Sequence, residues 1–92
     1  MNLRDDPSRP LFGISVAAEL ANTTVQNLRA YERRGLLEPG RTDGGTRRYS
    51  DDDVDVLLHI RALLDAGLNL AGVERVLELE GEIDRLRARL AR

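Results

Sequence analysis

The sequence predicts a mainly α-helical protein of the winged helix-turn-helix class, with a two-helix unit, a β-hairpin wing and two further helices before a short C-terminal coiled-coil helix. Apolar residues recur at helical spacing in several segments, and a glycine-rich turn separates two short extended pieces. The last apolar residues have heptad spacing. We expect a flexible arm (residues 1–11), a winged helix-turn-helix domain (12–78) and a C-terminal dimerisation helix (79–92).

Composition excludes several classes of protein. A chain of 92 residues is long enough for one small domain, and it contains no cysteine, so a disulfide framework or a thiolate zinc site is excluded. His59 is the only histidine, and we interpret it as a surface or boundary residue. No apolar run approaches the roughly 20 residues that cross a bilayer, and no apolar signal segment follows Met1. We therefore expect a cytoplasmic protein without a membrane partner, and no metal or cofactor.

The first helix is expected to begin at Ser15. Its apolar residues form one stripe: Val16, Ala17, Leu20 and Ala21. The N-terminal arm before it has prolines and charges without periodicity, which predicts a disordered or loosely docked segment. Asn22 is a residue that tolerates the left-handed conformation of a tight turn.

A second helix follows that turn and runs to about Arg34, where Gly35 stops it. Thr23 and Gln26 have the spacing of a capping box, and Thr24 is the alternative cap. Two short helices joined by such a turn form a helix-turn-helix unit. The face of the second helix that is not apolar carries Gln26, Asn27, Arg29, Arg33 and Arg34.

The next segment predicts a β-hairpin. The turn residues Asp43-Gly44-Gly45 lie between two short extended pieces, and the hairpin carries Arg41, Arg47 and Arg48. Residues 29–49 hold six arginines against three acids, although the net charge of the chain is −2. A local basic stretch matters more for binding phosphates than the global sum, because salt screens charges beyond about 8–10 Å.

Two helices and a heptad seam complete the chain. Ser50 is a helix cap followed by three aspartates at the positive end of the helix dipole, which fit this position better than a metal site. Gly67 ends that helix and Asn69 caps the next. Gly81 marks either a break or a weak point in one continuous helix. The dimerisation seam has spacings of 3, 4, 3 and 4 and consists of Val76, Leu79, Ile83, Leu86 and Leu90.

Five strings, in order, resemble the MerR family of bacterial transcription regulators over residues 12–79. They are Ile14-Ser15-Val16-Ala17, Leu28-Arg29-Ala30-Tyr31-Glu32, Gly35-Leu36-Leu37-Glu38-Pro39, Thr46-Arg47-Arg48-Tyr49-Ser50 and Ala66-Gly67-Leu68-Asn69-Leu70. Within the family the chain is most similar to the heat-shock-repressor branch. Three strings carry this similarity: Ile14-Ser15-Val16-Ala17-Ala18, Asn69-Leu70-Ala71-Gly72-Val73 and Glu78-Leu79-Glu80. The resemblance implies a DNA-binding repressor acting as a homodimer. The sequence offers no nucleophile–base pair and no phosphate-cradling glycine loop, so we do not expect an enzyme.

The chain departs from the family pattern at three sites in the helix-turn-helix unit. Ala30-Tyr31 stands where members have an aromatic pair, Asn22 replaces the glycine of the turn, and Asn27 replaces a threonine of the second helix. These changes are expected to alter the operator sequence without abolishing binding. We also expect no effector domain.

The DNA-binding residues expected on these grounds are Thr24, Gln26, Asn27, Arg29, Tyr31, Arg33, Arg41, Arg47, Arg48 and Tyr49. Asparagine and glutamine suit adenine edges, arginine suits guanine, and helix N-termini attract phosphates. Four alternatives stay open. Arg29 either contacts DNA or pairs with Glu32, the wing arginines either bind the backbone or are solvated, and each tyrosine either contacts DNA or packs in the core.

Two functions follow. The first is a sequence-specific repressor that binds double-stranded DNA as a homodimer on a two-fold operator and is associated with the nucleoid. The alternative is an adaptor that binds another regulator or a chaperone through the wing and the C-terminal helix. Salt distinguishes the two, because a protein that contacts several phosphates loses affinity steeply as salt rises.

Overall fold

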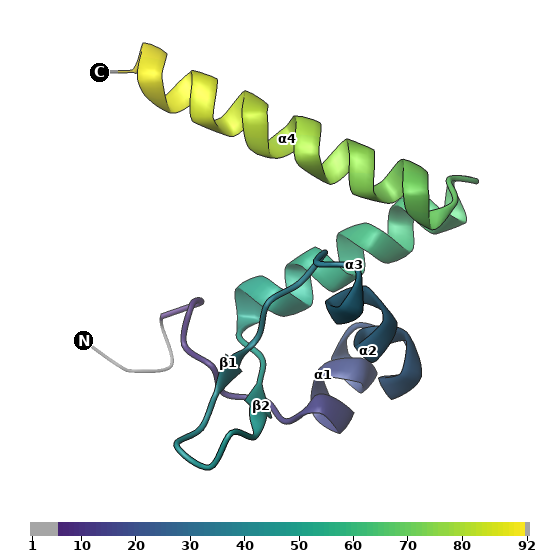
Figure 1. Cartoon of the computed structure of the whole chain (residues 1–92), viewed down its shortest axis with the longest axis vertical. Coiled ribbons are helices and arrows are strands. Elements are labelled where there is room, and N and C mark those ends of the chain that lie inside the picture. The colour runs from purple at the N-terminus through teal and green to yellow at the C-terminus, as the bar shows by residue number, and fades with distance from the viewer. Residues whose placement is uncertain (1–5, 92) are drawn as a thin grey trace. The chain divides into compact units, whose positions relative to one another are not determined.

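The computed structural model describes residues 6–91, and Figure 1 shows their elements in chain order. They are the helices and strands α1 (Ile14–Leu20), α2 (Val25–Arg33), β1 (Gly40–Arg41), β2 (Arg47–Arg48), α3 (Asp51–Asp65) and α4 (Leu70–Leu90). The described residues as far as Arg61 form one compact unit, and those from Ala62 onward form a second. The predicted mainly helical fold with one hairpin is confirmed.

Helix α1 buries a different stripe from the predicted one. Ala17, Ala18 and Ala21 are buried, whereas Val16 and Leu20 are 46% and 48% exposed. Two apolar stripes at i, i+4 spacing share this short helix, and the one made of alanines lets α1 approach α2 closely because it carries only methyl groups. The prediction of a single stripe that included Val16 and Leu20 was therefore wrong.

The predicted turn and the caps of the two later helices are confirmed, whereas at the second helix the alternative cap, Thr24, replaces the Thr23–Gln26 capping box. Asn22 has φ 54°, and the hydroxyl of Thr24, rather than that of Thr23, accepts the backbone N–H of Asn27 at 3.1 Å. Ser50 and Asp53 cap the start of α3 reciprocally, with N–H to side-chain oxygen distances of 2.9 and 3.1 Å. Each bond supplies a partner to a backbone N–H that the first turn of a helix leaves unpaired.

The described part of the N-terminal arm is docked through its backbone. The N–H groups of Leu11 and Phe12 both donate to the carbonyl of Tyr49, at 3.0 and 2.8 Å, and the N–H of Tyr49 donates back to Phe12 at 2.7 Å. The carbonyl of Pro7 accepts the N–H of Asp52 at 3.0 Å. Residues 1–5 of the predicted flexible arm lie outside the described residues.

The core of the first unit is formed by α1, α2, the end of the wing and α3. Its fully buried side chains include Leu28 of α2, Tyr49 after β2, and Leu57 and Ile60 of α3. The buried face of α3 begins at Val54, and Val56 is only half-buried.

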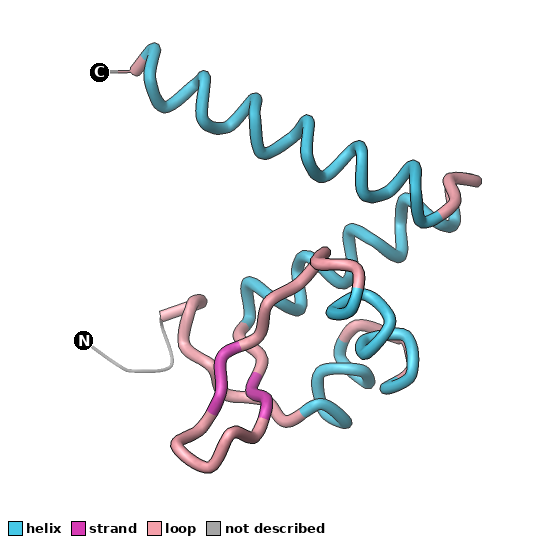
Figure 2. Tube along the Cα trace, viewed as in Figure 1, coloured by secondary structure: helices cyan, strands magenta, loops and turns pink. Residues whose placement is uncertain are grey.

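Helix α4 is continuous through Gly81, which decides between the two alternatives that the sequence left open. Asn69 caps it, as predicted, by accepting the N–H of Gly72 at 2.8 Å. Figure 2 shows the unbroken helix, and the hairpin strands in magenta. Of the predicted seam, Val76 is half-buried and the other members are exposed.

Candidate nucleic-acid interface

The turn between α1 and α2 fixes the start of the candidate recognition helix. The N–H of Thr23 donates to the carbonyl of Ala18 at 2.9 Å, and the guanidinium of Arg61 in α3 donates to the carbonyl of Asn22. The turn is thus held to α1 before it and to α3, which is distant in sequence. Because the hydroxyl of Thr24 accepts its capping bond, its own proton remains available to a phosphate oxygen.

Polar side chains along α2 are exposed, and one of them is held by a hydrogen bond within the chain. Gln26, Asn27, Arg29 and Arg33 are all exposed. The amide Nδ2 of Asn27 donates to the hydroxyl of Thr23 at 3.0 Å. The amide oxygen of Asn27 remains available as a hydrogen-bond acceptor. The predicted exposed face of the second helix is confirmed.

Arg29 does not form the ion pair with Glu32 that we considered as an alternative to DNA contact. The carboxylate of Glu32 is bonded to arginines of the wing instead, and Arg29 has no ion pair within residues 6–91. An exposed guanidinium one turn into the helix is free to address a guanine edge or a phosphate. Its DNA contact stays a prediction.

The wing is a two-stranded antiparallel hairpin in which Gly40 pairs with Arg48 and Arg41 with Arg47. Gly45 has φ 83°, a conformation that favours glycine, and its N–H donates to the carbonyl of Thr42 at 2.8 Å. The predicted hairpin and its glycine-rich turn are confirmed.

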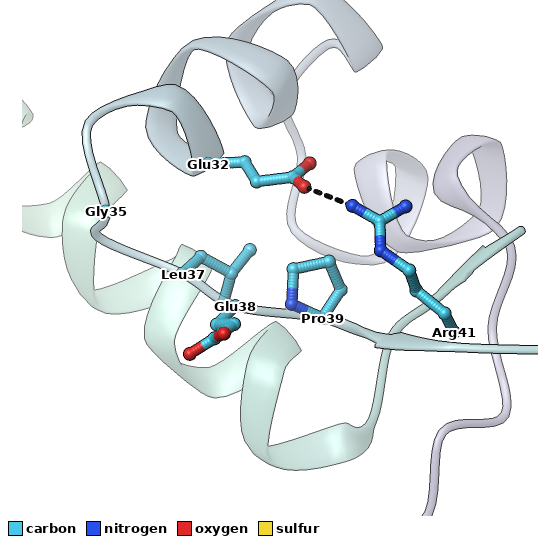
Figure 3. Close-up of a pocket in the computed structure, with 6 residues that line it drawn as sticks. All are labelled: Glu32, Gly35, Leu37, Glu38, Pro39 and Arg41. Carbon is cyan, nitrogen blue, oxygen red and sulfur yellow. Dashed lines mark hydrogen bonds and ion pairs between the residues drawn. The ribbon is translucent and has the colours of Figure 1, made fainter. Parts of the chain in front are cut away.

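Two of the three wing arginines are bound to an acid of α2. Glu32 Oε1 lies 3.1 Å from a terminal nitrogen of Arg41, and Oε2 lies 2.5 Å from Nε of Arg47. The other terminal nitrogen of Arg41 donates to the carbonyl of Gly45 at 3.2 Å. Figure 3 shows the Glu32–Arg41 pair beside Leu37 and Pro39. Arg48 is half-buried and is the wing arginine without an ion pair to any described residue.

Both tyrosines on the predicted interface are buried. Tyr49 is 0% exposed and Tyr31 is 5% exposed, so their side chains present almost no surface to a phosphate. Burial raises the pKa of Tyr49 above its ordinary value, and the nearby charge of Glu32 adds to the shift. For both residues the structure therefore favours the core role, and their assignment to DNA contact is corrected.

The sequence analysis missed the role of Glu32. We considered it only as a partner for Arg29, whereas it joins α2 to both strands of the wing. An acid within a basic stretch was the available signal, but its partners follow it by nine and fifteen residues. Helical spacing cannot identify partners at such separations.

The seam on α4 is apolar and exposed. The exposed fraction rises along it from 40% for Leu79 and 45% for Ile83 to 55% for Leu86 and 85% for Leu90. Within residues 6–91, no helix is long and apolar enough to cross a membrane, and no group of three potential metal ligands is present.

Comparisons with known proteins agree with this geometry. Residues 12–80 match the family model described as the MerR HTH family regulatory protein. The heat shock protein HspR of Streptomyces coelicolor is 47% identical over 83 residues, which are 89% of this chain and 55% of that protein. The transcriptional regulator GlnR of Bacillus anthracis is 45% identical over 73 residues, or 79% of this chain and 57% of that protein.

A solved structure resembles the chain closely. HiNmlR, described as a MerR family regulator lacking the sensor domain and bound to promoter DNA, superposes with a TM-score of 0.73 at 30% identity. The match covers 87% of this chain and 62% of HiNmlR. The chain spans little more than half the length of the two relatives named above. The family model, GlnR and HiNmlR are all described as regulatory proteins, which agrees with the expectation that the chain is not an enzyme.

Proposed function

Because this chain belongs to the MerR family of helix-turn-helix regulatory proteins, we propose that it binds operator DNA as a homodimer and represses the promoter it occupies. One observation carries the proposal: an exposed polar face on α2 lies next in the chain to a hairpin that bears three arginines. HiNmlR, a regulator of similar fold, is described as bound to promoter DNA.

The chemistry of α2 suits the major groove, which is about 12 Å wide and presents a distinct donor and acceptor pattern for each base pair. Asn27 and Gln26 would pair with adenine edges, and Arg29 with guanine. The Thr24 hydroxyl and Arg48 would bind backbone phosphates, which position a protein without reading its sequence. Association with the nucleoid would follow from DNA binding.

The exposed seam on α4 supports the homodimer. Two heptads are too short to be stable as an isolated helix in water, so an apolar seam of this length gains from a partner. Glu80 and Glu82 flank the first half of the seam, and Arg87 and Arg89 flank the second. In an antiparallel pair of copies, the acids of one helix lie opposite the arginines of the other.

Repression is what the resemblance to the heat-shock-repressor branch implies, and the relative HspR is described as a heat shock protein. A dimer seated on a promoter would repress by occluding or distorting the DNA. The same exposed seam would also serve an adaptor that binds a co-regulator such as a chaperone, which is the competing function.

The test is selection of bound duplexes from a random DNA pool at near-physiological salt, with the Arg29→Ala variant as a parallel selection. The proposal expects a two-fold symmetric motif for the wild type and a degenerate one for the variant, since two recognition helices read two half-sites. No enrichment by a protein shown to be folded would contradict DNA recognition and favour the adaptor.

A further inference from the structure

One acid lies at the centre of the most basic part of the chain. Between residues 29 and 49 there are six arginines and three acids, and Glu32 is the acid that is ion-paired to two of these arginines. Its side chain is only 16% exposed, whereas those of Arg41 and Arg47 are 47% and 40% exposed. The Glu32 carboxylate is thus partly shielded from water, whereas about half of each arginine side chain is exposed to solvent.

The contacts join three parts of the wing to the recognition helix. One carboxylate oxygen of Glu32 reaches Arg41 on β1 and the other reaches Arg47 on β2. Arg41 also bonds the carbonyl of Gly45 in the turn at 3.2 Å. Helix α2 and both strands are therefore connected through a single carboxylate, and Arg41 extends the connection to the turn. Figure 3 shows the Glu32–Arg41 part of this connection. Hydrogen bonds between ionised groups are stronger than those between neutral groups.

We propose that Glu32 is a positioning residue that determines how selective the protein is for its operator. It holds the wing at a fixed place relative to α2, and it neutralises two arginines that would otherwise bind any phosphate. The proposal rests on the proposed DNA-binding function and adds to it. Glu32 lowers affinity for random DNA more than it lowers affinity for the operator, so the ratio between the two rises.

The nitrogen atoms already in use support this reasoning. Both terminal nitrogens of Arg41 are bonded within the chain, one to Glu32 and one to Gly45. Arg47 uses Nε for Glu32, so a phosphate at its two terminal nitrogens would lie close to a carboxylate that repels it. Arg41, which the sequence assigned to DNA contact, thus serves first to hold the hairpin. Arg48 is the wing arginine best placed for sequence-independent binding.

The decisive variant is Glu32→Gln, compared with Glu38→Gln. Glu38, like Glu32, lines the pocket drawn in Figure 3. It is exposed and has no ion pair within the described part of the chain. Both variants remove one negative charge, but only Glu32→Gln releases arginines. Affinities for the selected operator and for a random duplex are measured by fluorescence anisotropy over a range of salt concentrations.

The slope of log affinity against log salt concentration changes by about 0.9 for each phosphate that a protein neutralises. For the random duplex we therefore expect Glu32→Gln to steepen this slope by about 1 for each arginine that it frees. The operator-to-random ratio should fall at least about threefold, with Glu38→Gln close to wild type. A folded Glu32→Gln protein with wild-type slope and ratio would overturn the proposal.

A second pair of variants covers the case in which Glu32→Gln does not fold. Arg48→Gln should reduce the salt-dependence slope of random-duplex binding by about 1. Arg41→Gln should reduce that slope by less, and it should also lower the operator-to-random affinity ratio. Equal reductions in slope would show that Arg41 binds phosphate like Arg48 and would overturn the proposal.

A measurement without DNA separates this proposal from the proposed function. Backbone ¹⁵N relaxation of residues 42–46 should show a more mobile turn in Glu32→Gln, or in Arg41→Gln, than in wild type. If wild type binds no duplex, the proposed function fails, and unchanged relaxation would additionally show that Glu32 does not hold the wing.

Discussion

The hydroxyl of Tyr49 is buried in the first unit without a partner. The side chain is 0% exposed, and its Oη makes no hydrogen bond to any protein atom in the described range 6–91. Burying a hydroxyl group without a hydrogen bond costs about 1–3 kcal/mol. Tyr49→Phe removes that group and keeps the ring, so we expect the free energy of unfolding to rise by about 1 kcal/mol. For a domain of this size the melting temperature should rise by about 4–8 °C.

The same substitution changes the response to alkali. Burial raises the pKa of Tyr49 above its ordinary value of 10.0. In the unfolded chain the phenol therefore ionises first, and the folded state binds more protons at pH values above about 10. The free energy of unfolding of wild type should fall as pH rises through this window. Phenylalanine does not ionise, so the advantage of the variant should grow with pH.

Urea unfolding followed by circular dichroism, at about pH 7 and at about pH 10.5, measures both effects. Operator affinity of the same samples provides the control, because a buried side chain should leave it unchanged. A variant about 1 kcal/mol less stable than wild type would show that the hydroxyl is hydrogen-bonded in solution. Unchanged stability with weaker binding would show that Tyr49 contacts DNA, and would refute the argument from burial.

Three further substitutions test the interface and the seam. Arg29→Ala should weaken operator binding by about 1–3 kcal/mol and random-duplex binding by less, as measured by anisotropy, if the guanidinium reads a base. Ile83→Asp should give monomers in sedimentation, because it places a charge in the seam, and a variant that stays dimeric would locate the interface elsewhere. Gly81→Ala should stabilise α4 by up to about 1 kcal/mol, seen as greater helical ellipticity, since the added Cβ meets only Arg85, at 3.5 Å.

The features that were predictable from sequence are those determined within a few residues. Asn22 in the turn, Ser50 at the start of α3 and Asn69 at the start of α4 each act on neighbours no more than four positions away. Side-chain capping and left-handed turns depend on such local chemistry, so the residue type alone is informative.

The features that were missed depend on which surface faces a neighbour. Both apolar stripes of α1 fit a helical period, and only contact with α2 selects the alanine stripe over Val16 and Leu20. Tyr49 is likewise buried at a point where its backbone pairs with that of Phe12, which is far from it in sequence. Residue type could not decide between core and DNA contact for an aromatic ring with a polar end.

The arrangement of arginines bears on how an operator is found. A regulator competes with a large excess of random sites, so the ratio of specific to random affinity matters more than either value alone. In a chain of net charge −2, every unpaired arginine on the wing adds to random binding. An acid that occupies two of them removes part of that sequence-independent attraction and leaves Arg29 exposed on the recognition helix. Selectivity would then depend on how few cations are free as much as on the residues that read bases.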